Sequence, residues 1–258
     1  MRTYKRSAVA VAAVSLALLV TACGAGEKSG DQGKDTGKGA GKDGAPSASA
    51  TSAPAAELLS AAELEKLIVG QADLPGHQVQ KAKAGEVPLA AAVSTDKPSC
   101  KPLADVMSYV APGKPGATAT RKAIEVPKTD GSAASPEEAL GALAAPVTGV
   151  TLGSYDGQGA QETFASLKTA GTECAGGFTL IGGGEKTKIS AVAPEPVTAG
   201  EEALAWTVTT DLDGRPFVTK VVVFRQGGTL ASFSTLSFGG TVKALPKAIV
   251  DAQAAKLG

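Results

Sequence analysis

Residue types that act as bases in covalent catalysis are scarce in this chain, which has one histidine, His77, in 258 residues. His77 follows the turn-forming pair Pro75 and Gly76, and no Gly-x-Ser-x-Gly sequence accompanies it, so we interpret it as an exposed loop histidine. A glycosidase requires two carboxyl groups at a defined distance from each other. The sequence has adjacent acids at 137–138 and at 201–202, but it does not show how far apart any two of their carboxyl groups lie. We therefore predict no catalytic residue, and a protein that is not an enzyme.

The sequence predicts no metal site and no cofactor. Asp211 and Asp213 precede Gly214 as in a calcium loop, but the glutamate expected further along is missing, so we interpret this segment as a hairpin turn. The three glycines at 182–184 lack the spacing of a phosphate-binding loop and do not open a helix. We interpret them as a strand connection.

The N-terminal sequence indicates a lipid modification. Basic residues at 2, 5 and 6 precede an apolar run at 8–20, an order typical of an export signal. Residues 17–24, Ala-Leu-Leu-Val-Thr-Ala-Cys-Gly, resemble the lipobox of bacterial lipoproteins. The resemblance implies that residues 1–22 are a signal peptide and that the thiol of Cys23 carries a diacylglyceryl group with palmitate chains. The alternatives are an uncleaved anchor helix and an ordinary secretory signal.

The segment that follows Cys23 has the composition of a tether. Residues 24–55 contain no large apolar side chain, so they cannot bury enough surface to offset the entropy of ordering. We expect residues 23–55 to be a lipidated cysteine with a disordered tether, and residues 56–258 to be a single globular domain. Lys plus Arg and Asp plus Glu number 25 each, so we expect no nucleic-acid partner. The Ala, Gly, Val and Thr bias resembles lipoproteins of high-GC Gram-positive bacteria.

Two cysteines remain once Cys23 is assigned to the lipid. In an oxidising exported setting, Cys100 and Cys174 are most simply one disulfide. The alternatives are a reactive thiol and a metal pair, and a metal pair would need further ligands from a chain with one histidine. The sequence therefore predicts a Cys100–Cys174 disulfide.

Helices are predicted at both ends of the domain and at each cysteine. Ser60 and Glu63 have capping-box spacing before an apolar stripe that ends near Gly70. Helical spacing of apolar residues continues in the remaining helices, which are expected after Cys100, from 160 to 174, and from 245 to 257. The stretches 77–98 and 128–147 are expected to be largely irregular, the first with a short strand and the second with a short helix that Pro136 opens.

Strands dominate the second half of the domain. Alternation predicts strands at 118–126, 150–155, 178–181, 186–193, 202–210, 217–225 and 230–238. Turn residues at 211–214 and 227–228 join the last three strands into an antiparallel meander with one buried side. The predicted fold class is α+β: an antiparallel sheet with a C-terminal three-strand meander, helices packed on one face, and one disulfide.

This order of elements resembles the extracytoplasmic sensor domains of mycobacterial-type Ser/Thr kinases and related lipoproteins. The resemblance covers residues 56–258 and is carried by Asp73-Leu74-Pro75, Cys100, Cys174, Trp206 and the closing helix at 248–257. It implies an α+β domain with a cleft, non-enzymatic, that binds a cell-envelope ligand. Those relatives often have two disulfides, whereas this chain can form only one.

The sequence therefore predicts a lipoprotein anchored at Cys23 on the extracytoplasmic face of the cell membrane. Its domain is expected to be a ligand-binding or sensory module for an envelope lipid, a glycan fragment or another small molecule. Trp206 and Phe164 are the candidate ligand-binding residues, although a tryptophan on an alternating strand is more often core. The alternative is an accessory protein that docks a membrane or cell-wall complex and holds no small molecule.

Overall fold

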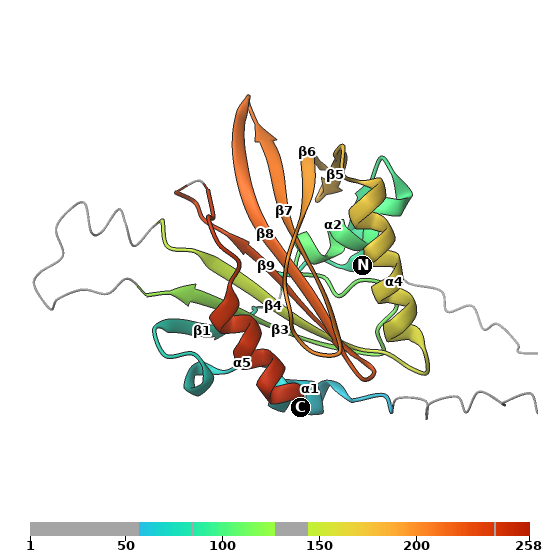
Figure 1. Cartoon of the computed structure of the whole chain (residues 1–258), viewed down its shortest axis with the longest axis vertical. Helices are drawn as coiled ribbons and strands as arrows, with labels where there is room; N and C mark the ends of the chain where they lie inside the picture. Colours follow the sequence, from blue (N-terminus) through green and yellow to red (C-terminus); the bar gives the residue numbers. More distant parts are fainter. Residues whose placement is uncertain (1–56, 84, 127–143, 240) are drawn as a thin grey trace, which may run out of the picture. The chain divides into compact units, whose positions relative to one another are not determined.

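The structure, a computed structural model, describes residues 57–83, 85–126, 144–239 and 241–258 (Figure 1). All of these residues belong to one compact unit, Ser52–Gly258. Its strands form one antiparallel sheet in the order β1-β3-β4-β9-β8-β7-β6-β5-β2. They are β1 (His77–Lys81), β2 (Val93–Thr95), β3 (Ala117–Glu125), β4 (Val147–Ser154), β5 (Phe178–Gly182), β6 (Glu185–Glu195), β7 (Glu202–Leu212), β8 (Arg215–Gln226) and β9 (Thr229–Leu236). The α-helices are α1 (Ala61–Leu67), α2 (Lys101–Met107), α4 (Gly159–Glu173) and α5 (Lys247–Leu257).

The first helix begins at the capping box that the sequence predicts. The Ser60 amide donates to the Glu63 carboxylate at 2.8 Å, and the Glu63 amide donates to the Ser60 hydroxyl at 3.3 Å. Two of the amides that a helix start leaves unpaired are thereby satisfied. Leu64, in the next turn of the helix, is fully buried in the apolar cluster between the helix and the sheet.

The disulfide joins two helices, as predicted. Cys100 precedes α2 and Cys174 caps the C-terminal end of α4, and their Cα atoms lie 5.9 Å apart. Both cysteines are fully buried. The bridge therefore fixes α2 against α4, and both helices cover the same face of the sheet.

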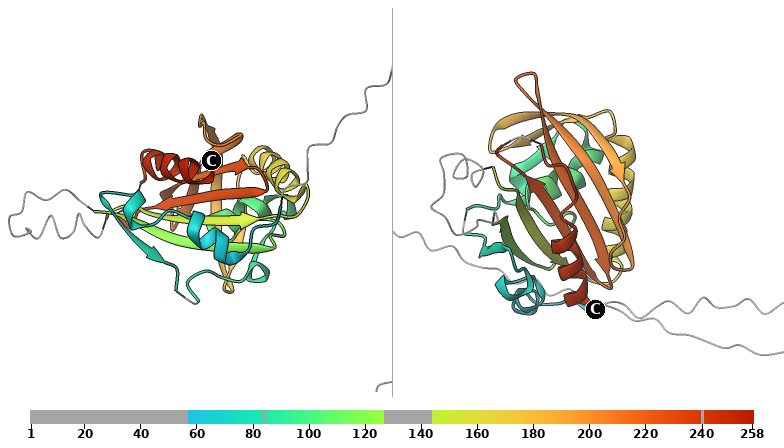
Figure 2. Two further views of the ribbon diagram at one scale, coloured as in Figure 1. Left: turned by 90° about the horizontal axis from the view of Figure 1, so that it is seen from below. Right: turned by 60° about the vertical axis from the view of Figure 1, so that its left-hand side comes forward.

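The α+β class, the antiparallel sheet and the C-terminal meander are confirmed, but the helices cover both faces of the sheet rather than one (Figures 1 and 2). The reason lies in β8, where residues 221–224 are all apolar and fully buried. Because side chains alternate along a strand, Val221 and Val223 pack under α4 while Val222 and Phe224 pack under α5. The meander therefore has two buried sides, and the expectation of one was wrong.

The stretch 77–98 is more regular than predicted. It holds β1, which pairs with β3, and β2, which pairs with β5, so the two ends of the sheet come from one segment. The strands are short, and β1 is rich in polar residues, which is why alternation did not reveal them. The loop and short helix expected at 128–147 lie outside the described residues except for 144–147, where β4 begins at Val147.

Candidate functional site

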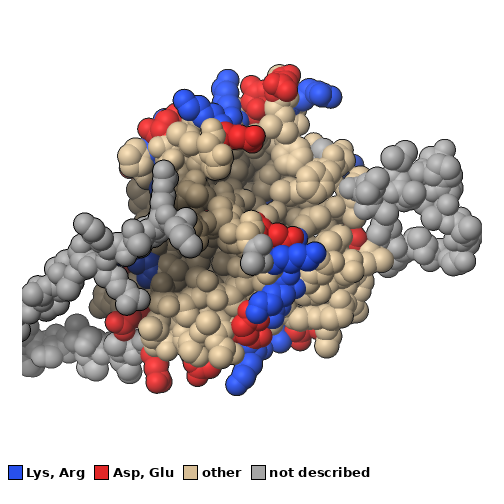
Figure 3. Space-filling view, turned by 180° about the vertical axis from the view of Figure 1, so that it is seen from behind, with Lys and Arg blue, Asp and Glu red and all other residues tan. Residues whose placement is uncertain are grey.

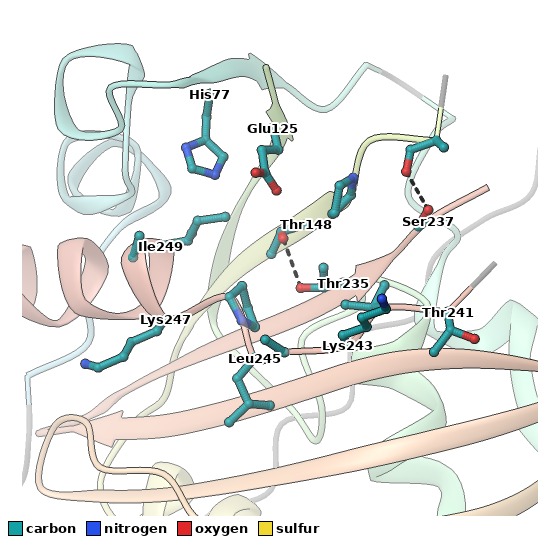
Figure 4. Close-up of a pocket in the computed structure, with 16 residues that line it drawn as sticks. His77, Glu125, Thr148, Thr235, Ser237, Thr241, Lys243, Leu245, Lys247 and Ile249 are labelled. Carbon is teal, nitrogen blue, oxygen red and sulfur yellow. Dashed lines mark hydrogen bonds between the residues drawn. The ribbon is translucent and has the colours of Figure 1, made fainter. Parts of the chain in front are cut away.

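A cavity of about 570 Å³ lies between the start of α5 and the neighbouring ends of β1, β3, β4 and β9 (Figure 4). Its volume falls within the roughly 300–1,000 Å³ typical of small-molecule sites. Its lining combines apolar and polar side chains contributed by five separate segments. The polar residues are His77, Glu125, Thr148, Thr235, Ser237, Thr241, Lys243 and Lys247. We call this cavity the His77 pocket.

Strand pairing brings His77 and Glu125 together. The chain turns at Gly76, whose φ of 84° favours glycine, and the Val126 amide donates to the Gly76 carbonyl at 2.9 Å. This turn starts β1 at His77, which stands directly opposite Glu125 of β3 in the antiparallel ladder. Figure 4 shows both side chains on the same side of the pocket. An imidazole and a carboxylate therefore share one wall.

The floor of the pocket is lined with hydroxyl groups that bond to other protein atoms. The buried Thr148 and Thr235 face each other across β4 and β9, with their hydroxyls 2.9 Å apart. The Ser237 hydroxyl donates to the Ala144 carbonyl at 2.6 Å. Each hydroxyl keeps unused hydrogen-bonding capacity, because a hydroxyl offers one donor and two acceptor positions. The floor can thus recognise polar groups of a ligand.

The charged groups lie at the rim. Lys243 and Glu125 are exposed and form no ion pair among the described residues, whereas Lys247 pairs with Asp251 at 2.7 Å. The Nδ1 atom of His77 is buried and has no hydrogen-bond partner in the structure. A buried polar atom without a partner is costly, by about 1–3 kcal/mol. A ligand that bonds to this nitrogen would remove that cost.

His77 is therefore not the exposed loop histidine expected from the sequence: it is half-buried and opens a strand. It does lie in one pocket with an acid and several hydroxyls, the constellation that would favour an enzyme. However, no hydroxyl described here bonds to His77, and the three buried hydroxyls bond elsewhere. Among the described residues, no nucleophile–base hydrogen bond of the kind that covalent catalysis uses is formed to His77. The arrangement as it stands suits recognition of a polar ligand.

The residues singled out from the sequence lie away from this pocket. Trp206 and Phe164 are 3% and 5% exposed, within the apolar cluster between α4 and the sheet. Neither lines the His77 pocket, so their role in ligand binding stays a prediction. Cys23 lies outside the described residues, and its lipidation also stays a prediction.

The pocket residues carry no motif that a reader of the sequence could find. Thr148 and Thr235 belong to strands far apart in the chain, and Lys243 lies in a connection between β9 and α5. The only local signal in the sequence is that His77, the single histidine, follows a Pro-Gly turn. Among the described residues no three His, Cys, Asp or Glu side chains are placed to hold a metal ion. No described helix is long and apolar enough to cross a bilayer.

Comparison with known proteins gives little more. No family model matches the chain, and no curated protein matches it. Among solved structures, the extracellular domain of the kinase PknH from Mycobacterium tuberculosis is similar with a TM-score of 0.46 and 12% sequence identity, covering 78% of this chain and 97% of that one. This is the class of domain that the order of elements resembles. A likeness at this level carries no argument, so the function must be argued from the site.

Proposed function

We propose that this protein is a membrane-anchored extracytoplasmic lipoprotein whose domain is a non-enzymatic ligand-binding or sensory module, with the His77 pocket as its ligand site. The observation that carries the proposal is the pocket itself: a cavity of about 570 Å³ with hydroxyls at its floor, charges at its rim and an unpartnered imidazole nitrogen. The export signal and Cys23 support the location.

The ligand that fits this lining is a small polar molecule with several hydrogen-bonding groups, such as a glycan fragment. The Lys243 ammonium and the Glu125 carboxylate at the rim can pair with charges of either sign on the ligand. Thr148 and Ile249 at the floor are buried, and a hydrogen bond that a ligand makes in such low-dielectric surroundings is stronger than one made in water. A ligand in the pocket would contact the first residues of α5 and could shift that helix. Such a shift would give the domain a way to signal that the ligand is bound.

The test is mass spectrometry of the protein isolated from its own membranes. For the anchor, the N-terminal peptide should begin at Cys23 and carry the mass of a diacylglyceryl group; an unmodified cysteine or an intact signal peptide would contradict it. For the ligand, the native spectrum should show a discrete added mass that disappears on denaturation. A bare mass in the native spectrum would favour the accessory protein without a small-molecule ligand.

The Lys243→Glu variant locates the ligand. Because Lys243 is exposed, the substitution should leave the fold intact, and it should lower occupancy at least several-fold by reversing one of the charges that line the pocket. The matched control is Lys186→Glu, the same charge change at an exposed residue of β6 that lines none of the described cavities. Equal loss in both variants would mean that the ligand binds elsewhere.

A further inference from the structure

Two further cavities lie over the face of the sheet that is turned away from α5. One, of about 450 Å³, lies over β3, β4 and the end of β9; the other, of about 390 Å³, extends toward Lys114. Val87, Tyr109 and Thr120 line both, so the two cavities adjoin. We call them together the Tyr109 groove. Figure 3 shows this side of the molecule hollowed, with uncharged side chains lining the hollow and charged ones mainly around it.

Tyr109 lies in the groove with a backbone conformation that is unfavourable for a tyrosine. It has a φ of 61°, a left-handed conformation that side chains other than glycine rarely adopt. The Tyr109 amide bonds to the Val106 carbonyl at 3.1 Å and the Val110 amide to the Asp105 carbonyl at 2.9 Å, the pattern of a Schellman end to α2. Glycine is the usual residue at this position of the motif.

The tyrosine ring is accommodated because Gly149 has no side chain. A Cβ at Gly149 would lie 2.1 Å from Cδ1 of Tyr109, so the ring lies directly on the backbone of β4. The Tyr109 carbonyl also accepts a hydrogen bond from the Thr151 hydroxyl at 3.0 Å. Burial raises the pKa of Tyr109 to about 12, so the phenol is neutral over the physiological range. A bulky neutral ring is thus fixed where the two cavities meet.

The lining of the groove is mainly apolar, with threonine hydroxyls at Thr118, Thr120 and Thr151 and charged residues at Lys122, Glu86 and Lys114. The first cavity is walled by Val87, Ile124, Val147, Leu236 and Phe238. At its border the Lys122 ammonium is already paired with the Glu86 carboxylate at 2.7 Å. Phe238 is 80% exposed and adds a large apolar surface to the wall of this cavity, contiguous with Leu236 and Val147. At the far end of the groove, Lys114 is exposed and pairs with no carboxylate among the described residues.

A peptide strand does not suit this surface. Under the groove lie β3, β4 and β9, which are interior strands of the sheet, hydrogen-bonded on both sides. An added strand needs a free edge to pair its backbone groups, and the ends of the described sheet are β1 and β2. An extended peptide lying in the groove would therefore leave its own amides and carbonyls without partners in the sheet. A hydrocarbon chain has no polar groups to satisfy.

From these observations we infer that the Tyr109 groove binds a single long acyl chain with an anionic head group, with the chain between Tyr109 and Phe238 and the head at Lys114. The ligand chemistry is shared by a free fatty acid and by a one-chain anionic lipid. This site is separate from the His77 pocket, and the inference does not rest on the proposed function.

The test is displacement of a fluorescent fatty acid from residues 52–258, the compact unit that contains both apolar clusters and the disulfide. Hexadecanoic acid and a single-palmitoyl lysophosphatidylglycerol serve as the two competitors, and the tighter one identifies the source of the chain. Saturable binding of one molecule per protein is expected. Absence of saturable displacement by either would overturn the inference.

Phe238→Asp and Val87→Trp test the location of the chain. The first removes an exposed apolar wall and the second fills the junction, and each should weaken binding roughly tenfold or more. The matched control for Phe238→Asp is Leu212→Asp, which changes a 46% exposed apolar residue at the β7–β8 turn, outside both cavities. If Leu212→Asp weakens binding as much as Phe238→Asp, the probe binds non-specifically and the site is wrong.

Lys114→Gln tests the head group. It should weaken hexadecanoic acid several-fold and leave hexadecan-1-ol unchanged, because the alcohol presents the same chain without the charge. An equal effect on the acid and the alcohol, or no effect on either, would contradict the placement of the head at Lys114. Lys243→Glu in the His77 pocket should leave both affinities unchanged, and a loss there would mean that the two sites are one.

Discussion

The two sides of the sheet are held in different ways. On one side α2 and α4 are joined by the Cys100–Cys174 bridge over a sealed apolar cluster. On the other, α1 and α5 are joined by polar contacts: the Gln253 side chain bonds to the Val69 amide and the Leu67 carbonyl, both at 2.9 Å. The Lys256 ammonium adds an ion pair with Asp73 at 2.8 Å. Both sides have a buried apolar cluster, but only the α2–α4 side adds a covalent link, whereas the α1–α5 side adds polar contacts.

This difference bears on where a ligand can act. The His77 pocket adjoins α5, whose residues 247–249 line it, whereas no residue of α4 lines the His77 pocket or either cavity of the Tyr109 groove. A small adjustment of α5 would alter the pocket without disturbing the disulfide-linked core. Helix α4 can therefore serve as a scaffold and α5 as the part that responds at the His77 pocket, whereas the Tyr109 groove lies on the other face, beside the end of α2.

Removing the disulfide should have the largest effect on stability. The double variant Cys100→Ala with Cys174→Ala should lower the free energy of unfolding by about 4 kcal/mol, because the bridge closes a loop across 74 positions of the chain. Urea unfolding of the oxidised wild type and the variant measures it. Reduction of the wild type should reproduce the loss. A change below about 1 kcal/mol would mean that the two sides do not differ in the way described.

Breaking the Gln253 contact should loosen the other side alone. Gln253→Leu leaves the buried Val69 amide and the Leu67 carbonyl without partners and should cost about 2–3 kcal/mol. In hydrogen exchange, the amides of α5 should exchange faster while those of α4 keep their protection. Gln78→Leu, at an exposed position of β1, is the control and should change little. Equal loss of protection in both helices would show that the two sides open together.

Much of the disulfide-linked side could be predicted from the sequence. The two cysteines and the strand alternation in the meander are pairwise or local signals, as is the capping box at Ser60 on the α1–α5 side. The second buried face of the sheet was not predicted, although the sequence of β8 indicates it. Residues 221–224 are four consecutive apolar residues, so they place apolar side chains on both faces of the strand rather than on one.

The site was not predicted, for a physical reason. Its wall is a cross-strand pair between His77 and Glu125, and its floor a pair between Thr148 and Thr235, which lie 87 positions apart in the chain. Such pairs follow from strand order, and the order β1-β3-β4-β9 is fixed by non-local pairing. Gln253 was missed likewise, since a glutamine in a predicted amphipathic helix gives no sign that it is fully buried.

The two sides should also respond to pH in opposite directions, with effects smaller than those above. On the disulfide side, burial raises the pKa of Asp105 above its ordinary value, although Lys101 pairs with it at 2.5 Å. The folded state then holds this proton more tightly than the unfolded state, so the contribution of Asp105 to stability falls as pH rises above about 3.8. Asp105→Asn should therefore gain stability relative to the wild type as pH rises through that region.

On the α5 side, hydrogen bonds from Lys256 and from the Gly70 amide lower the pKa of Asp73. The folded state binds this proton more weakly, so its stabilising contribution is present above the ordinary value and is lost as pH falls through the lowered pKa. Asp73→Asn should cost up to about 1 kcal/mol at neutral pH, as expected for a partly exposed pair, and nothing in strong acid. Urea unfolding of both variants between pH 2 and pH 7 measures the two trends. Parallel trends would contradict the comparison, because the two carboxyl groups would then share one kind of environment.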